Sequence, residues 1–324
     1  MRLPYRAAMI AAGCILSAAA SASAQNYPHK AIRFIMPYPA GGSIDTTGRI
    51  VAQQLAENLG QQVVIDNRTG AGGTVGTEIA ARAAADGYTL VMGGTGTLAL
   101  SPNLQRNLPY DPARDFAPVT LLVIVPYVLV VPPALRVNSV KELIALAKSR
   151  PDQINYGSGG NGSAPHLAAE LFKNMAGVRL VHVPYKGSTP AINDVIAGQV
   201  QLTFTGIPSV LAHIKSGRLR PIGVTSATRA AALPEVPAIR ESGVPGYEVS
   251  PWFGVLVPAR TPPALVTRLN GEFLKVLRSQ VIRERFSAEG VEPVGNTPEQ
   301  FASYIKLELV KWGKVIKQAG IRVD

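Results

Sequence analysis

Short apolar segments alternate with longer amphipathic segments along most of the chain. The first apolar segment, residues 32–36, is followed by a turn of small residues and then by residues 44–59, where apolar side chains recur at the spacing of one helix face. Gly60 ends this predicted helix. A repeated strand-then-helix rhythm indicates parallel strands with helices on both faces of a sheet. The pattern therefore predicts an α/β fold.

The alternation forms two series of similar size. In the first series we expect strands at 32–36, 62–65 and 88–92, and helices at 44–59 and 74–84. In the second we expect strands at 154–156, 180–183, 201–204 and 221–225, and helices at 143–148, 164–175, 191–197 and 210–215. The C-terminal part is predicted to be helical at 264–278, 281–288 and 298–318.

Two apolar segments connect the series. Residues 119–133 are too long and continuous for one ordinary strand, and Pro126 would break a central ladder, so this segment predicts two strands or a hinge between domains. Residues 252–258 predict the return crossing. We therefore expect two domains, a discontinuous one of residues 25–126 plus 249–324, and a second one of residues 127–248.

The first 24 residues predict a secretory signal peptide. Arg2 and Arg6 form a basic start, residues 7–20 are apolar, and an Ala-x-Ala sequence ends at Ala24, where we expect cleavage. The apolar stretch is shorter than the roughly 20 residues that a spanning helix needs. The single cysteine, Cys14, would be removed with this segment, which leaves no disulfide and no thiolate nucleophile in the mature chain.

Composition and charge restrict the possible classes of binding partner only slightly. Hydrophobic residues make up 47% of the chain, enough for real cores, and the formal net charge is +11. A basic protein attracts anions. The Lys and Arg residues are scattered singly, however, without the basic runs or basic-aromatic alternation of nucleic-acid binders. We expect a diffuse attraction for small anions and no nucleic-acid partner.

Three glycine-rich turns follow predicted strands and precede predicted helices, at residues 40–43, 157–163 and 186–188. Such turns present backbone N–H groups and the positive end of a helix dipole to a ligand. In open α/β sheets they lie at the carboxyl ends of the strands, where ligands bind. A single glycine turn is more often a simple tight turn. Their presence in both series predicts a cleft with anion-binding groups on both walls.

The sequence disfavours a cofactor or a catalytic centre. Residues 157–162 fit G-x-G-x-x-G, but the next strand runs into 183–186 without the acidic residue that would hold a ribose. The chain has no G-x-S-x-G elbow, H-E-x-x-H, P-loop or EF-hand sequence, and its four histidines are dispersed. We therefore expect no cofactor, no metal and no enzymatic activity.

For each of three residues near the turns, the sequence allows two roles. His166 lies in the first turn of a predicted helix and serves either as a ligand contact or in a structural hydrogen bond. Asp45 follows Gly42 in a first helical turn, where a carboxylate suits the dipole. It is either a cap or a group that accepts a hydrogen bond from the ligand. Lys186 is either a ligand contact or a solvated turn residue.

Six blocks of sequence occur in a characteristic order: YPHKAIRFIMPYPAGGSID, VIDNRTGAGGTVGTEIAARAAADGYTL, LPYDPARDFAPVT, NYGSGGNGSAPHLAAELFK, VPYKGSTPAINDVIAGQV and PWFGVLVPARTP. Together, from about Tyr27 to the C-terminus, they resemble the Bug family, the extracytoplasmic solute receptors of tripartite tricarboxylate transporters. The resemblance implies a monomeric periplasmic receptor with a type II periplasmic binding protein-like fold. In this fold two α/β domains, joined by crossing hinge strands, close on a small carboxylate that is handed to membrane permease subunits.

The resemblance also implies the ligand-binding residues, which act largely through backbone groups and bound water. The first wall is Tyr38, Ala40, Gly41, Gly42 and Asp45. The opposing wall is Ser158, Ser163, His166, Tyr185, Lys186 and Gly187. Further candidates for the lining are Thr95, Thr205, Trp252 and Phe253. Two other functions remain open, a ligand sensor that signals to a non-transporter partner and an exported enzyme on the same fold. The identity of the carboxylate is also open.

Overall fold

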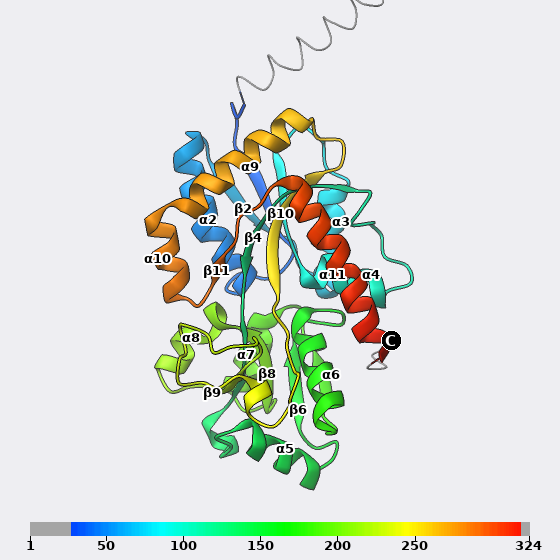
Figure 1. Ribbon diagram of the computed structural model, residues 1–324, viewed down its shortest axis with the longest axis vertical. Helices are drawn as coiled ribbons and strands as arrows, with labels where there is room; N and C mark the ends of the chain where they lie inside the picture. Colours follow the sequence, from blue (N-terminus) through cyan, green and yellow to red (C-terminus); the bar gives the residue numbers. More distant parts are fainter. Residues whose placement is uncertain (1–26, 319–324) are drawn as a thin grey trace, which may run out of the picture.

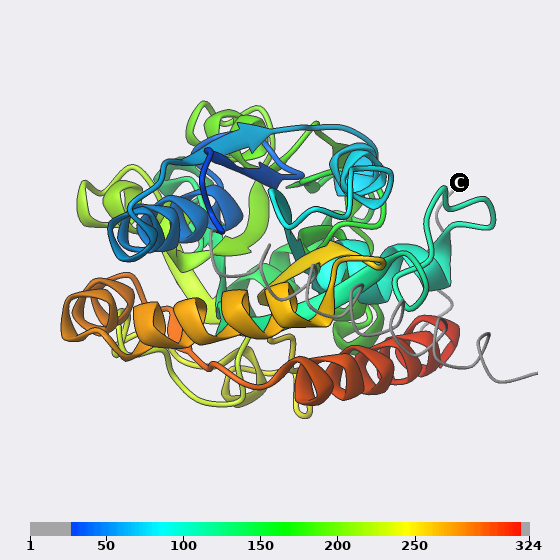
Figure 2. The same ribbon diagram turned by 90° about the horizontal axis from the view of Figure 1, so that it is seen from above.

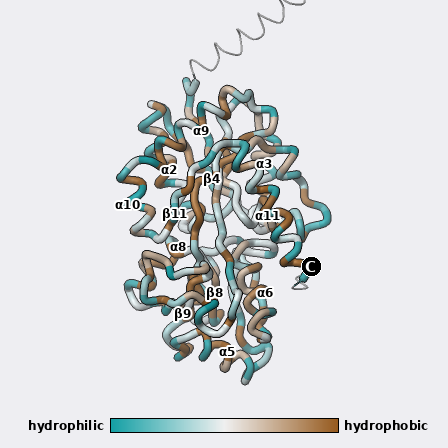
Figure 3. Tube along the Cα trace, in the orientation of Figure 1, coloured by the Kyte–Doolittle hydropathy of each residue, from teal (hydrophilic) through white to brown (hydrophobic). Residues whose placement is uncertain are grey.

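The computed structural model describes residues 27–318, so the predicted signal peptide and its cleavage after Ala24 lie outside the described residues. Two lobes follow one another along the long axis of the molecule, each built on its own sheet (Figure 1). The most hydrophobic stretches run through the middle of the lobes, while the hydrophilic residues lie mainly on the periphery (Figure 3). Within residues 27–318, no helix combines the length and the apolar character needed to cross a membrane.

The first lobe contains a six-stranded sheet. Its strands are β1 (Ile32–Met36), β2 (Val63–Asn67), β3 (Thr89–Gly94), β4 (Phe116–Ile124), β10 (Trp252–Pro258) and β11 (Glu292–Pro293). Across the sheet they follow the order β11-β4-β10-β3-β1-β2. In β1, Phe34 lies opposite Ile65 of β2 and Leu90 of β3. Strand β1 is almost entirely buried, as expected for a strand covered on both faces.

Helices from both ends of the chain cover this sheet. They are α2 (Ser43–Leu59), α3 (Thr74–Ala81), α4 (Ser101–Leu104), α9 (Pro263–Arg278), α10 (Gln280–Ala288) and α11 (Pro298–Gln318). Short 3-10 and π-helical turns, η1 (Ala71–Gly73) and η2 (Thr95–Leu100), lie between them. Helix α2 ends where Gly60 adopts a left-handed conformation with φ of 64°, which glycine tolerates without strain. From above, α9, α10 and α11 form one layer along a side of the lobe (Figure 2).

The second lobe contains a five-stranded sheet in the order β7-β6-β8-β5-β9. Its strands are β5 (Tyr127–Val131), β6 (Asn155–Ser158), β7 (Val181–Pro184), β8 (Leu202–Gly206) and β9 (Arg220–Val224). Its helices are α5 (Val140–Ser149), α6 (Ala164–Ala176), α7 (Ser188–Ile196) and α8 (Ile207–Lys215), with 3-10 turns η3 (Pro133–Leu135) and η4 (Ile239–Glu241). The two series of strands and helices predicted from the sequence are therefore confirmed.

The chain crosses between the lobes twice, which confirms the predicted crossing strands. Strand β4 belongs to the first sheet and β5 to the second, with Pro126 between them. The chain returns through Pro251 into β10. The N–H of Val125 donates to the carbonyl of Pro251 over 2.8 Å, so the two crossing segments are joined to each other. The domain boundaries at residues 126 and 249 stay a prediction.

The expectation of parallel sheets is wrong for part of each sheet. Strand β1 pairs in parallel with β2 and β3, and β6 pairs in parallel with β7 and β8. By contrast, β10 is antiparallel to β3 and β4, and β5 is antiparallel to β8 and β9. The reason is the crossing itself. Strands β5 and β10 enter their sheets from the hinge and run away from it, while strands that lead into helices run toward the cleft.

Candidate ligand-binding site

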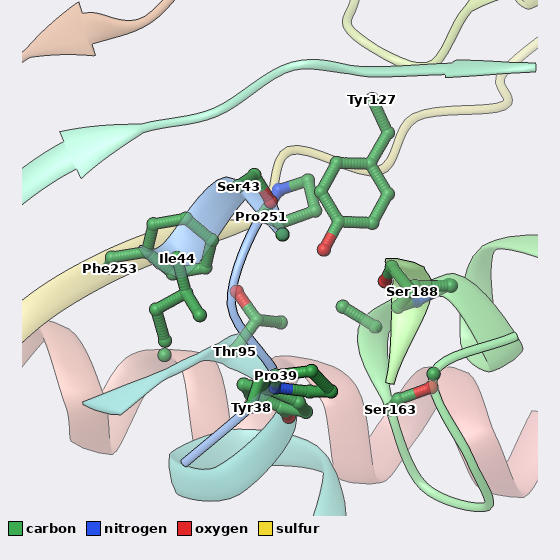
Figure 4. Close-up of a pocket in the computed structure, with 16 residues that line it drawn as sticks. Tyr38, Pro39, Ser43, Ile44, Thr95, Tyr127, Ser163, Ser188, Pro251 and Phe253 are labelled. Atoms are coloured by element: carbon green, nitrogen blue, oxygen red, sulfur yellow. The ribbon is translucent and has the colours of Figure 1, made fainter. Parts of the chain in front are cut away.

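A cavity that is partly open to solvent lies between the two lobes at the carboxyl ends of their strands. Its wall is formed by residues from both lobes and from the second crossing (Figure 4). The lining residues are Tyr38, Pro39, Gly42, Ser43, Ile44, Gly94, Thr95, Gly96, Tyr127, Gly159, Ser163, Ala164, Pro165, Ser188, Pro251 and Phe253.

Three helices begin at this cavity without a side-chain cap. The residues that precede them are Gly42 for α2, Ser163 for α6 and Gly187 for α7, and none of them bonds the first turn through its side chain. Helix α5, which does not border the cavity, is capped instead by Ser139, whose hydroxyl accepts from the N–H of Glu142. The uncapped helices therefore keep N–H donors and positive dipole ends for an anion in the cavity.

Among the described residues that line the cavity, none carries a formal charge. The carboxylate of Asp45 is buried beside the wall, where it accepts from the N–H of Gly41 at 2.9 Å, Nε of Arg49 at 2.8 Å and Nδ2 of Asn67 at 2.9 Å. Burial opposes ionisation, but the hydrogen bonds from Arg49, Gly41 and Asn67 outweigh it and lower the pKa of the Asp45 carboxyl. Asn67 also donates to the carbonyl of Tyr38 at 2.9 Å. Asp45 and Asn67 thus hold the turn that forms the first wall.

The hydroxyl groups around the cavity differ in their availability. Tyr38 donates to the carbonyl of Gly72 at 2.7 Å, and Ser163 donates to the carbonyl of Gly160 at 2.7 Å. The hydroxyl of Tyr127 points into the cavity (Figure 4), and burial raises the pKa of this phenol, so it stays a donor. Thr95 accepts from the N–H of Trp252 at 3.0 Å, which leaves its own hydrogen for another acceptor.

The two lobes touch beside the cavity, so the structure is closed. The hydroxyl of Thr189 donates to the carbonyl of Ala40 at 2.9 Å across the cleft. Elsewhere the approach is so close that a Cβ on the glycine would lie within 2.6 Å of the facing atom. These pairs are Gly187 with Pro39, Gly72 with Asn161, and Gly206 with Ser43.

A stack of rings supports the glycine loop of the second lobe from behind. His182 lies between His166, at 4.2 Å between ring centroids, and Tyr156, at 4.8 Å. Nε2 of His182 lies 2.6 Å from the hydroxyl of Ser158, and the N–H of Gly162 donates to Nδ1 of His166 at 3.3 Å. Burial, reinforced by the neighbouring His166, lowers the pKa of His182 to about 3. Burial also lowers the pKa of His166, so both rings are neutral at physiological pH, and they hold the loop in place.

The structure brings five of the fifteen predicted ligand-binding residues to the cavity wall: Tyr38, Gly42, Thr95, Ser163 and Phe253. The other ten are not among the lining residues: Ala40, Gly41, Asp45, Ser158, His166, Tyr185, Lys186, Gly187, Thr205 and Trp252. Lys186 is exposed, and the hydroxyl of Tyr185 donates to Asp194 at 2.6 Å. Contact of each predicted residue with a ligand stays a prediction.

Several lining residues were not among the predicted ligand-binding residues, most notably Ser43, Tyr127, Ser188 and Pro251, although Ser43 and Ser188 belong to the predicted turns 40–43 and 186–188. Tyr127 and Pro251 flank the two crossings. Because both crossings pass the cleft, the predicted crossings could have indicated that these two residues line it. Ser43 and Ser188 each follow the glycine that precedes a helix. Within residues 27–318, no group of three or more His, Cys, Asp or Glu side chains is placed to hold a metal ion.

Comparisons with known proteins agree on one family. The profile of the tripartite tricarboxylate transporter family receptor matches residues 47–321. Protein BugT of Bordetella pertussis is 40% identical over 306 residues, which cover 94% of each chain. The solved structure of the periplasmic binding protein BugD is 34% identical with a TM-score of 0.88, covering 91% of this chain and 99% of that one. R. palustris Rpa4515, solved with adipate, is 40% identical with a TM-score of 0.89, covering 91% and 99%.

Proposed function

Because the chain belongs to the tripartite tricarboxylate transporter receptor family, we propose that it captures a small organic carboxylate and delivers it to a membrane transporter of that class. Members of this family are periplasmic solute-binding receptors, and the related Rpa4515 was solved with adipate. The observation that carries the proposal is the meeting of three uncapped helices, from both lobes, at one uncharged cavity.

A carboxylate suits this cavity because the wall supplies donors without supplying charge. An ionised carboxylate accepts up to about four hydrogen bonds, and hydrogen bonds to a charged partner are roughly twice as strong as neutral ones. The positive dipole ends of α2, α6 and α7 balance the charge. Since α2 belongs to the first lobe and α6 and α7 to the second, a bound acid would contact both lobes and favour the closed arrangement over an open one.

We propose further that the mature chain begins after Ala24, acts in the periplasm as a monomer, and performs no chemistry on its ligand. The relatives support a receptor. A close serine–histidine pair, Ser158 and His182, lies behind the loop, with Ser158 fully buried and outside the cavity wall. A pair in that position supports the loop instead of attacking a substrate.

A thermal-shift screen of residues 25–324 against organic acids tests the proposal. A ligand at 100 times its Kd stabilises the folded state by about 2.7 kcal/mol, which for a chain of this length corresponds to roughly 4 °C in melting temperature. We expect some carboxylates to raise the melting temperature and their amides to leave it unchanged. If neutral compounds raise it and no acid does, the proposal is wrong.

The helix N-terminus can be tested separately at Ser188, the first residue of α7. Ser188→Pro removes the backbone N–H at a helix position that accepts proline, while Ser188→Ala removes only the hydroxyl. Losing a hydrogen bond to a charged group costs about 1.5–3 kcal/mol. We therefore expect Ser188→Pro to bind the acid more than about tenfold more weakly than Ser188→Ala. Equal affinities would remove α7 from the carboxylate site.

Tryptophan fluorescence provides a second readout of binding. The chain has two tryptophans, Trp252 and Trp312, and both donate their indole N–H to Glu308, at 2.9 and 2.8 Å. Trp252 directly precedes Phe253 of the cavity wall, and its backbone N–H donates to Thr95 of the same wall. A ligand that moves either wall residue should therefore change the emission of Trp252.

A further inference from the structure

Thr225 directly follows β9, is fully buried, and is hydrogen-bonded to the chain at both crossings between the lobes. At the first crossing, the N–H of Tyr127 donates to the Thr225 hydroxyl at 3.1 Å, and the N–H of Thr225 donates to the carbonyl of Tyr127 at 2.8 Å. Before the second crossing, the Thr225 hydroxyl donates to the carbonyl of Val249 at 2.6 Å, and the N–H of Val249 donates to the carbonyl of Thr225 at 2.9 Å.

The hydroxyl of Thr225 has one hydrogen and two carbonyl groups within reach. The carbonyl of Tyr127 lies 3.2 Å away and that of Val249 lies 2.6 Å away, so the shorter distance assigns the hydrogen to Val249. The oxygen of the same hydroxyl stays the acceptor for the N–H of Tyr127. One buried side chain therefore joins the two segments that connect the lobes.

Both of these segments carry residues of the cavity wall. Tyr127, the first residue of β5, lines the cavity, and its hydroxyl points into it (Figure 4). Pro251, two residues after Val249, also lines the cavity. Thr225 itself is not among the lining residues. It thus fixes the backbone from which wall residues extend, without contacting the cavity.

Resting on the proposed function, we propose that Thr225 is a positioning residue for ligand binding. By holding the backbone of Tyr127, it aims the phenolic hydroxyl at an oxygen of the bound acid, to which that hydroxyl donates. Thr225 acts only through Tyr127 and makes no contact with the ligand.

The side chain of Thr225 is needed because of where the strand ladder begins. The pairing of β5 with β9 starts at Val128 and Val224, so the N–H of Tyr127 has a side-chain oxygen as its acceptor in place of a strand carbonyl. Without that oxygen a buried N–H would be unpaired, and the start of β5 would move to find another acceptor. Hydrogen bonds weaken steeply as their distance and angle change, so a small movement of the Tyr127 backbone is felt at its hydroxyl.

Two substitutions at Thr225 test this role, with calorimetric titration of an acid found in the screen. Thr225→Val keeps the shape of the side chain and removes the hydroxyl, while Thr225→Ser keeps the hydroxyl. We expect Thr225→Val to bind the acid at least about tenfold more weakly, as when a hydrogen bond to a charged group is broken. Thr225→Ser should stay within about threefold of the native chain. Native affinity in Thr225→Val, or an equal loss in both variants, overturns the inference.

Thr120 supplies a matched control for a loss of stability alone. It is fully buried in β4, its hydroxyl donates to the carbonyl of Asn296 at 2.9 Å and accepts from the N–H of Asn296 at 3.0 Å, and it does not line the cavity. Thr120→Val therefore loses the same kind of hydroxyl as Thr225→Val. Both variants should lower the urea unfolding midpoint, but only Thr225→Val should weaken binding. An equal loss of affinity in Thr120→Val would assign the effect to general destabilisation and overturn the inference.

A double-mutant cycle tests whether Thr225 acts through Tyr127. Tyr127→Phe should itself weaken binding at least about tenfold, and adding Thr225→Val to it should cost less than about threefold more. The full loss in the Tyr127→Phe background overturns the inference. If Thr225→Val does not fold, Tyr127→Phe decides, because native affinity in that variant leaves nothing to position. If no acid binds the native chain, the proposed function fails, so the two failures are distinguishable.

Discussion

Replacing Gly206 by alanine should hinder closure of the two lobes without straining either lobe. Gly206 precedes α8 with φ of −61° and ψ of 137°, a conformation open to any residue. A Cβ at this position would lie 2.6 Å from both Cβ and Oγ of Ser43, on the opposite lobe, and 3.2 Å from Cγ1 of Val125. The Cβ of Ser43 is fixed by the backbone of α2, so a rotamer change cannot remove the clash.

The cost falls mainly on the closed state. Overpacking of this kind typically costs about 1–3 kcal/mol, and a penalty confined to the ligand-bound arrangement appears directly in the binding free energy. We therefore expect Gly206→Ala to weaken ligand binding by roughly 5- to 150-fold. The urea unfolding midpoint of the ligand-free protein should change little, because an open form avoids the contact.

The assay is calorimetric titration with an acid identified in the screen, with a double-mutant cycle as the decisive part. Ser43→Gly removes both clashing atoms, so it should restore much of the affinity in the Gly206→Ala background, although Ser43 itself lines the cavity. Native affinity in Gly206→Ala, or a loss that Ser43→Gly does not relieve, would refute the reasoning that the bound form is the closed form seen here.

Three further outcomes follow from the structure. Gly271→Ala, in α9 with no other atom within 4 Å of the added Cβ, should stabilise the protein by about 0.5–1 kcal/mol in urea unfolding and leave ligand affinity unchanged. The pKa of His182 is lowered from 6.5 to about 3 in the folded chain, so the unfolded state takes up a proton first as the pH falls. Stability should therefore decrease below pH 6.5 by up to about 1 kcal/mol per pH unit, less steeply in His182→Gln, and an equal slope in both proteins would contradict this. Glu308→Leu leaves the buried indoles of Trp252 and Trp312 without their acceptor and should cost about 2–4 kcal/mol, whereas Glu308→Gln, which keeps an acceptor, should cost less; equal losses would exclude this reason.

Much of the fold followed from local patterns. The apolar run of β1, the helix face of α2 and the left-handed Gly60 are short-range features, and each has a direct trace in the sequence. Pro126 likewise marked the first crossing. The direction of β5 and β10 was not predictable in this way, because it depends on which lobe each strand enters from, a long-range property that hydrophobic periodicity does not contain.

The site was predictable as a set of loops but not as a set of side chains. Glycine turns indicated where donors would gather, and Gly42 and Ser163 do line the cavity. Which neighbours face inward depends on contacts far away in the sequence. Asp45 illustrates this. Its carboxylate lies outside the cavity wall and accepts a hydrogen bond from the side chain of Asn67, 22 residues further along the chain. Tyr127 reaches the cavity only because β5 starts at the hinge.

The discontinuity of the first lobe has a consequence for how the chain folds. Strand β10 lies between β3 and β4, yet it comes more than a hundred residues after either of them. Until it arrives, β3 and β4 lack their shared partner and present open edges, which are hazards for aggregation. Long-range pairing of this kind is also slow. The strands of the second lobe lie within one continuous segment, so we expect that lobe to form first and the first lobe to complete only when β10 is available.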